Sequence, residues 1–316
     1  MKKVVVFGGG TGLSCLLSGL KLFPLDVTAV ITMSDNGSST GQLKKELDIP
    51  AVGDVGKVLL SMANIDGDFS KLMGYRFTKA SFLENHPIKN ILLAALIDIK
   101  GNITEATKYM SELLNINGTV LPLTEEKIEL VGISKTKKEY FGEEEVSANA
   151  SKIVKLKYDH DIKINKEIIT KIKEADLILF SPGSLYTSIM PHLLSKDVIK
   201  AIDSVKTPVM YVSNLVTQPG ETDKYNVSDH IKKLNEYLGN HKVDVVLANN
   251  AKVDVKIKRK YFKEEKKELV KIDKKNIERE KTRLIEDNIF SIEDGTIRHN
   301  SLKTAFIIFS YLMEGE

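Results

Sequence analysis

The stretch "VVVFGGGTGLSCLLSGL" (residues 4–20) places a short apolar run directly before four glycines within five positions. A continuous apolar run is typical of a strand that is buried on both faces, and the residues from Gly12 onward follow a helical pattern. Glycine allows the backbone to turn sharply and to approach another group closely. The stretch therefore predicts a strand, a tight turn and a helix, which together form the first unit of a parallel α/β sheet.

Further units of the same kind follow along the chain. Other apolar runs rich in Val and Ile predict buried strands at 27–33, 177–181, 209–214 and 243–249. Helical patterns precede or follow the strands, at 12–22, 57–64, 88–99, 103–115, 165–175, 185–194, 228–238 and 301–313. This alternation predicts a Rossmann-like, doubly wound α/β fold with a mostly parallel sheet and helices on both faces.

Residues 118 to 160 interrupt the alternation. Within them, "KIELVGIS", "KKEYFGEEEV" and "KIVKLKY" alternate apolar and polar residues with period two. Such a pattern predicts a small antiparallel β unit with one exposed face. No low-complexity linker flanks it, so we expect a single nucleotide-binding domain over 1–316 with the 118–160 unit packed on its core.

Composition narrows the class of protein. Forty-six Lys+Arg nearly balance 43 Asp+Glu, giving a formal net charge of +3, which argues against a dedicated nucleic-acid binder. The single cysteine, Cys15, forms no internal disulfide and suits a reducing compartment. The apolar runs fall short of the ~20 residues that cross a membrane. We expect a cytoplasmic protein without membrane insertion.

Five polar loops follow the predicted parallel strands. They are residues 8–12, 34–41, 181–188, 213–222 and 249–252, and they offer backbone amides, hydroxyls and side-chain amides. Because the carboxyl ends of parallel strands share one edge of a sheet, these loops should surround one pocket. Their chemistry predicts a polar, phosphorylated ligand.

The glycine loop itself predicts phosphate binding by Gly9, Gly10, Thr11 and Gly12. Phosphate oxygens need several N–H donors, which a glycine turn at a helix start supplies. The dinucleotide fingerprint is incomplete, because Cys15 stands where a third glycine or alanine is expected, and the P-loop lysine is absent. The alternative is a tight turn without a ligand.

Two aspartates have open roles. Asp35 lies about where a dinucleotide-binding fold places its ribose-binding carboxylate, with Asn36 beside it. Asp35 and Asp54 could instead hold Mg²⁺ against a diphosphate, and Asp35 could simply cap a helix or close an Asx-turn. Gly183 and Ser184 begin a second glycine turn, which predicts a second anion site at a helix start.

Taken in order, these segments resemble the gluconeogenesis factors of bacteria, the YvcK-like branch of the superfamily that also contains the CofD-like 2-phospho-L-lactate transferases. The matching stretches include "VVVFGGGTGLS", "DNGSSTGQLKKELDIPAVGDV", "NHPIKNILLAAL", "ADLILFSPGSLYTSIMPHLL", "YVSNLVTQPGETDKYNVSDHI" and "IRHNSLK". They extend over nearly the whole chain, and "SPGSLYTSI" and "TQPGET" are unusual strings.

The resemblance implies a nucleoside diphosphate ligand. The YvcK-like branch is associated with UDP-sugars and with control of the cell envelope and cell shape on gluconeogenic carbon sources. The CofD-like branch transfers a phospholactyl group from a guanosine diphosphate donor with Mg²⁺. By position, the resemblance places further residues in the pocket: His86, Asn90, Asn214, Thr217, Gln218, Tyr261 and Arg298. Tyr261 would stack on a uracil and Arg298 would pair with a phosphate.

Departures from the family pattern weaken the case for transferase chemistry. An arginine of the family is replaced by Gly56, and lysines at 44, 57 and 89 restore positive charge without the planar fork of arginine. Asp35, Asp54 and His86 are the candidate catalytic residues, but they do not make a complete set. We therefore expect a UDP-sugar-binding regulatory protein, with an Mg²⁺-dependent transferase as the alternative.

An oxidoreductase with NAD(P) as its redox cofactor is the weakest hypothesis, because the third glycine and a Tyr-x-x-x-Lys motif are missing. The sequence leaves open whether any reaction is catalysed, whether the chain forms a homodimer, and which protein partner in envelope regulation receives its signal.

Overall fold

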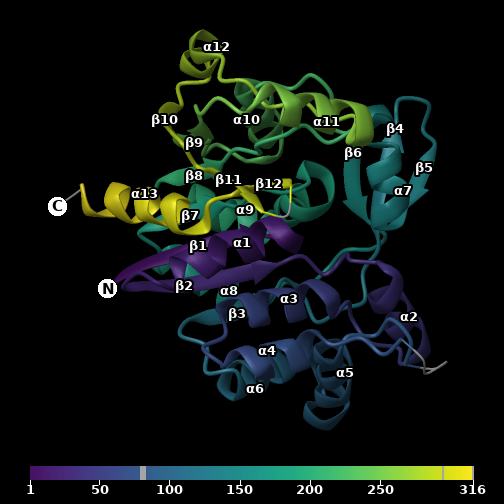
Figure 1. Cartoon of the computed structure of the whole chain (residues 1–316). Helices are drawn as coiled ribbons and strands as arrows, with labels where there is room; N and C mark the ends of the chain where they lie inside the picture. The colour runs from purple at the N-terminus through teal and green to yellow at the C-terminus, as the bar shows by residue number, and fades with distance from the viewer. Residues whose placement is uncertain (79–82, 294, 315–316) are drawn as a thin grey trace.

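A computed structural model of the chain describes residues 1–78, 83–293 and 295–314. Its centre is a seven-stranded sheet in the order β10-β9-β8-β7-β1-β2-β3, and every neighbouring pair is parallel (Figure 1). The strands are β1 (Lys2–Gly8), β2 (Leu25–Ile31), β3 (Thr119–Pro122), β7 (Leu177–Phe180), β8 (Val209–Val212), β9 (Val245–Asn249) and β10 (Arg283–Asp287). The predicted doubly wound α/β fold is confirmed.

The strand order reverses at β1. The chain proceeds from β1 to β2 and β3 on one side, and returns to place β7 against the other side of β1, with Val4 opposite Leu177 and Phe7 opposite Phe180. In open parallel sheets, ligands bind beyond the carboxyl ends of the two strands that flank such a reversal. The loops after β1 and β7 therefore define where a site is expected.

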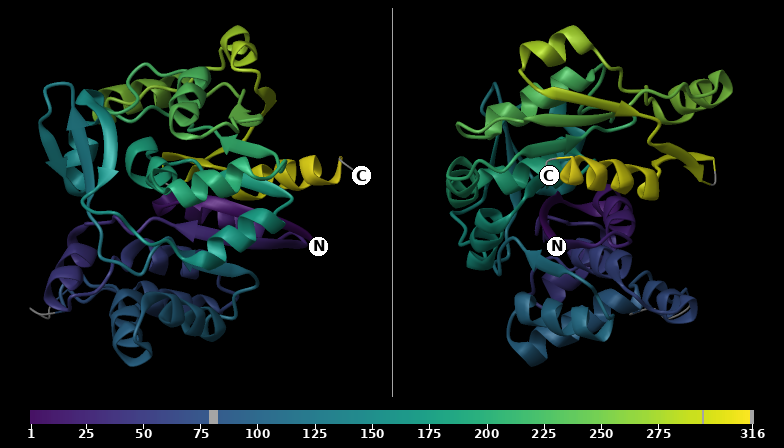
Figure 2. Two further views of the ribbon diagram at one scale, coloured as in Figure 1. Left: turned by 180° about the vertical axis from the view of Figure 1, so that it is seen from behind. Right: turned by 90° about the vertical axis from the view of Figure 1, so that its left-hand side faces the viewer.

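Helices cover both faces of the sheet, and the two views in Figure 2 show both layers. On one face α1 packs between α3 and α13, and on the other face α8 and the turn after β7 contact β1. The α-helices outside the antiparallel unit are α1 (Gly10–Leu20), α2 (Ser38–Glu46), α3 (Gly53–Met62), α4 (Gly67–Gly74), α5 (Ile88–Lys100), α6 (Ile103–Leu113), α8 (Lys166–Glu174), α9 (Lys196–Asp203), α10 (Val227–Tyr237), α11 (Val255–Glu265), α12 (Lys274–Arg279) and α13 (Ser301–Met313).

Two glycines let α1 approach its neighbours closely. A Cβ atom at Gly12 would lie well inside van der Waals contact with the carbonyl oxygen of Pro182, and one at Gly19 would do the same with the carbonyl oxygen of Ser301. Gly12 therefore serves packing between the loops after β1 and β7, in addition to any role toward a ligand.

The small antiparallel sheet comprises β4 (Leu130–Ser134), β5 (Glu139–Phe141) and β6 (Ile153–Tyr158), with α7 (Gly142–Ala148) and a 3₁₀ turn (Ala150–Lys152) beside it. The expected range of 118–160 also includes β3, which pairs with β2 in the main sheet. The "TVLP" run of β3 is buried almost throughout, as suits a parallel strand rather than a half-exposed one.

The predicted helix at 185–194 is wrong as a continuous α-helix. A single π-helical turn (Leu185–Ile189) is followed by a 3₁₀ helix (Met190–Leu194) that has Pro191 in its first turn. Proline lacks the N–H that would continue an α-helical ladder, and π turns are frequent near functional sites. The edge strand β10, "RLIED", was not predicted because its charged residues interrupt the apolar pattern.

Candidate functional site

A cavity of about 620 Å³ lies at the point where the strand order reverses. It is enclosed by the loops after β1, β7 and β8 and by the hairpin of β11 (Phe290–Glu293) and β12 (Thr296–His299). It brings together ten of the residues predicted for the site: Gly9, Gly10, Thr11, Gly12, Gly183, Ser184, Asn214, Thr217, Gln218 and Arg298. We call this space the switch-point cavity.

Cys15 also lines the switch-point cavity. Its Sγ donates to the carbonyl oxygen of His299 at 3.2 Å, which ties α1 to the hairpin. Burial raises the pKa of the Cys15 thiol and so favours its neutral form. This arrangement gives Cys15 a packing role in the cavity wall.

The turn at the start of α1 already contains a carboxylate. Gly10 adopts φ +61°, and its N–H donates to Oδ2 of Asp54 at 2.9 Å. Asp54 lies in the first turn of α3, where its Oδ1 is 3.1 Å from Nζ of Lys57. Burial raises the pKa of Asp54, against the opposing charge of Lys57. The first-turn amides of Thr11 and Gly12, for which a helix supplies no acceptor of its own, are the ones that remain for a ligand.

The Asp35 carboxylate accepts hydrogen bonds from residues that follow it in the chain. Its Oδ1 accepts from the Gly37 N–H at 2.8 Å, and its Oδ2 accepts from Thr40 Oγ1 at 2.9 Å. Asn36, next to it, donates toward Glu129 of the antiparallel unit at 3.4 Å. Thus the turn-forming role considered for Asp35 is present, and neither residue lines the switch-point cavity.

Asp35 and Asp54, the residues considered for a magnesium ion, already interact within the chain. All four of their carboxylate oxygens accept a hydrogen bond, and a lysine stands against Asp54. Within residues 1–78, 83–293 and 295–314, no group of three His, Cys, Asp or Glu is arranged to hold a metal ion. An ionised carboxylate oxygen can accept a hydrogen bond and also ligate a cation, so a magnesium ion at Asp35 and Asp54 stays a prediction.

His86 and Asn90 form a buried cluster with Ser39. His86 Nδ1 is 2.9 Å from Ser39 Oγ, and Asn90 Nδ2 donates to the same oxygen at 3.3 Å. Neither residue lines the switch-point cavity. Gly56 lies against Asn90 and Lys89, since a Cβ there would meet both at 3.1 to 3.3 Å. The space that a larger residue at 56 would need is thus filled by α5.

The second glycine turn also holds an internal anion. Glu221, buried to 4% exposure, accepts from Ser184 Oγ at 2.7 Å and from the Leu185 N–H at 2.6 Å. Asn214 fixes the preceding residue, because its side-chain amide both accepts from and donates to the Gly183 backbone at 2.8 Å. Burial raises the pKa of Glu221 to about 7. Glu221 therefore occupies the helix start at which a second anion was expected.

Glu143 is a further carboxylate that the sequence did not single out. It lies on α7, near the Thr187 hydroxyl and the backbone N–H of Asn36, both of which favour its charged form. Burial, together with the nearby charges of Asp35 and Asp54, raises its pKa to about 7. Its only signal in the sequence is a place among three consecutive glutamates, which by itself indicates a solvated helix start.

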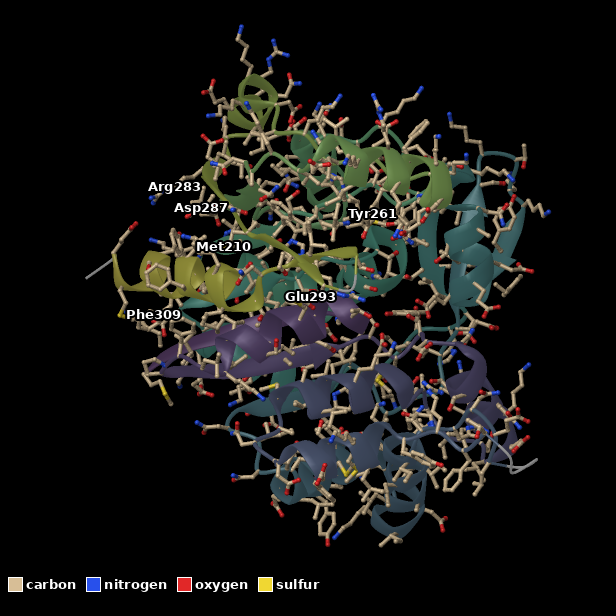
Figure 3. The ribbon with its side chains drawn as sticks, viewed as in Figure 1. Met210, Tyr261, Arg283, Asp287, Glu293 and Phe309 are labelled. Atoms are coloured by element: carbon tan, nitrogen blue, oxygen red, sulfur yellow. The ribbon has the colours of Figure 1, made fainter. Side chains whose placement is uncertain are left out.

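Tyr261 lies in a neighbouring cavity of about 670 Å³ beneath α11. The two cavities share Val216, Lys267 and Ile297 as a common boundary. The Tyr261 hydroxyl accepts from the Ile297 N–H, so that Tyr261 joins α11 to the hairpin (Figure 3). Tyr261 is 4% exposed, which leaves little of its ring open for stacking.

Tyr261→Phe is expected to lower the free energy of unfolding by about 1 kcal/mol, because the buried Ile297 N–H would lose its acceptor. Thermal unfolding checks this, with Tyr75→Phe as the control, since Tyr75 is 51% exposed. Equal melting temperatures for Tyr261→Phe and the wild type would contradict the expected role of this hydroxyl.

Positive charge reaches the switch-point cavity from two residues, Arg298 and Lys267. Arg298 is an exposed side chain on β12, and Lys267 forms an ion pair with Glu265 at 2.6 Å. Lys267 also lines the cavity that Tyr261 lines, whereas Arg298 lines only the switch-point cavity. In the part of the chain that the structure describes, no helix is both long enough and apolar enough to span a membrane.

Known proteins are similar to this chain over nearly its full length. The family profile described as 2-phospho-L-lactate transferase CofD matches residues 4–290. The gluconeogenesis factor of Bacillus subtilis is 36% identical over 99% of this chain and 98% of its own. That of Halalkalibacterium halodurans is 38% identical over 96% of this chain and 94% of its own.

A crystal structure of a Bacillus halodurans protein superposes with a TM-score of 0.92 at 38% identity, covering 98% of this chain and 99% of that one. The fold, the family profile and the relatives agree over nearly the full length. The chain belongs to the CofD family and, within it, to the gluconeogenesis factors.

Proposed function

We propose that this protein binds a UDP-sugar in the switch-point cavity and acts as a cytoplasmic regulatory protein that links carbon supply to the cell envelope. The observation that carries the proposal is the cavity itself, which is lined by the start of α1, by the cationic side chain of Arg298, and by hydroxyls and amides. Such a combination suits a charged diphosphate that carries a neutral polar group.

The diphosphate is assigned to the side of the cavity that carries positive charge. The first-turn amides of Thr11 and Gly12 lie at the positive end of the α1 dipole, and Arg298 offers a planar fork for phosphate oxygens. Lys267 adds a second cation. The Gly10 N–H already donates to Asp54, so the phosphate is assigned to the next two amides of the turn, those of Thr11 and Gly12.

The nucleoside is assigned to the neighbouring cavity beneath α11. This cavity adjoins the first at Val216 and Ile297, and its lining includes apolar residues such as Leu269 and Ile272. An apolar space next to a phosphate site suits the flat ring of a base. Tyr261 holds the wall of that cavity in place, because its hydroxyl accepts a hydrogen bond from the Ile297 N–H.

Isothermal titration calorimetry with UDP-N-acetylglucosamine tests the proposal. We expect Arg298→Ala to weaken binding by about 10- to 100-fold, because a charged hydrogen-bond pair contributes roughly 1.5–3 kcal/mol. Arg279→Ala, on the exposed helix α12, is the matched control and should bind as the wild type does. Absence of heat at millimolar ligand, or an unchanged affinity of Arg298→Ala, would sink the proposal.

A second candidate is a transferase that uses a nucleoside diphosphate-linked donor. The family profile favours it, and Glu143 gives it a carboxylate whose pKa of about 7 suits a general base at neutral pH. Incubation with guanosine and uridine diphosphate-linked donors, Mg²⁺ and a panel of acceptor alcohols tests this candidate. Release of nucleotide that depends on the acceptor would support it, and no release with any acceptor would reject it.

A further inference from the structure

Glu221 stands directly behind one wall of the switch-point cavity without lining it. The wall in front of it is formed by Gly183, Ser184 and Ser188. Glu221 reaches this wall from the loop after β8 and holds Ser184 and Leu185 through two short hydrogen bonds. In the folded protein, the Glu221 carboxylate therefore already accepts hydrogen bonds from the helix start beside the ligand space.

The groups around Glu221 do not neutralise it. Three tyrosines lie near it, Tyr186 in the π turn, Tyr211 on β8 and Tyr225 in the loop before α10. Burial raises the pKa of each tyrosine, to about 12 for Tyr186. The cation Lys233 lies over the Tyr186 ring at 5.7 Å.

A histidine completes these surroundings. His230 stacks on Tyr211, and burial lowers its pKa, so that its imidazole is neutral in the neutral pH range. Glu221 is thus the group of this cluster whose charge changes near neutral pH.

From this geometry we infer that Glu221 is a positioning residue that closes the second helix start to anions, so that the Gly183–Ser184–Ser188 wall receives an uncharged, hydroxyl-bearing part of the ligand. The inference rests on the proposed function and specifies which end of the UDP-sugar meets which wall. Negative charge on the ligand is confined to the side of Thr11, Gly12 and Arg298, and the sugar faces Ser184.

The chemistry of the wall agrees with a neutral sugar. Ser184 and Ser188 supply hydroxyls, and Thr217 and Gln218 on the adjoining loop supply a hydroxyl and an amide. These groups can exchange hydrogen bonds with sugar hydroxyls. A carboxylate on the sugar would instead face the buried charge of Glu221, in a region where few water molecules screen it.

Two ligands that differ only in sugar charge test the inference. UDP-glucose and UDP-glucuronate share the uridine diphosphate, and neither changes its charge between about pH 6 and pH 8. In calorimetric titrations the wild type should prefer UDP-glucose by about 10-fold at pH 8 and by clearly less at pH 6, where Glu221 is mostly protonated.

Glu221→Gln keeps the size of the side chain and removes its charge. We expect this variant to bind both ligands with similar affinity at both pH values. Glu139→Gln is the control, because Glu139 is exposed on β5 and does not line the switch-point cavity, and it should keep the pH-dependent preference.

The outcomes separate the two proposals. If the wild type binds both ligands equally at both pH values, or if Glu221→Gln keeps the wild-type preference, the inference fails while UDP-sugar binding stands. If the wild type binds neither ligand, the proposed function fails and the inference fails with it. The wild-type pH profile keeps the inference testable even if Glu221→Gln does not fold, because a preference that is the same at pH 6 and pH 8 overturns it.

Discussion

Gly12→Ala is expected to lower the free energy of unfolding by about 3 kcal/mol, because the added Cβ would collide with the backbone carbonyl of Pro182. A backbone group cannot rotate away as a flexible side chain can, so the loops after β1 and β7 must move apart. The same displacement would open the switch-point cavity on its two glycine-containing sides. Urea unfolding curves at constant pH measure this loss, and the proposed binding of a UDP-sugar should weaken with it.

Gly67→Ala is the matched control for this substitution. Gly67 lies in the first turn of α4, where a Cβ would meet nothing within 4 Å. Its stability should stay within about 0.5 kcal/mol of the wild type, as for other surface substitutions. If Gly12→Ala were as stable as Gly67→Ala, the close packing of α1 on the 182–183 turn would be refuted.

The second large effect is a loss of stability as the pH rises. Glu143 and Glu221 each have a pKa of about 7 in the folded protein, against 4.5 ordinarily, chiefly because both are buried. A carboxyl whose pKa is raised by folding stabilises the native state while it is protonated, and this contribution is lost as the pH rises through the folded value. Between about pH 5 and pH 8, each group should lower the free energy of unfolding by roughly 2–3 kcal/mol.

Glutamine variants assign this effect to its residues. Glu143→Gln and Glu221→Gln should each remove one part of the pH dependence, seen as a shallower fall of the free energy of unfolding between pH 5 and pH 8. Glu139→Gln, on the exposed side of β5, should leave the slope unchanged. Buried His192 and His299, whose pKa burial lowers to about 4, add stability as the pH rises toward 6.5, so the difference between each variant and the wild type is the quantity to compare. A difference that does not change between pH 5 and pH 8 would contradict the raised pKa of that glutamate.

Much of the fold was predictable from local patterns. The strands at the centre of the sheet, β1, β2, β7, β8 and β9, are continuous apolar runs, and each was expected within a few residues of its observed bounds. The two edge strands, β3 and β10, were not expected in this sheet. The run of β3 is buried, but it was included in the range expected for the antiparallel unit. Strand β10 is partly exposed and carries charged residues, which interrupt the apolar pattern of a buried strand.

The sequence predicted most of the residues of the site, but not which of them contact one another. Nine of the ten predicted residues that meet in one cavity follow parallel strands, whose carboxyl ends share one edge, and the tenth, Arg298, comes from the hairpin. His86 and Asn90 instead form hydrogen bonds with Ser39 of α2, and Tyr261 lines an adjoining cavity. Whether a polar side chain points into a pocket or into a neighbouring helix depends on packing, which one sequence does not encode locally.

By itself, the sequence determined that a glycine turn joins the first strand to the first helix, since few other residues permit that backbone and that close approach. Only the tertiary structure decided what the two helix starts hold. Asp54 lies 44 residues from Gly10, and Glu221 lies 36 residues from Leu185. Amides at a helix start attract any nearby anion, and folding brings two of the chain's own carboxylates there first.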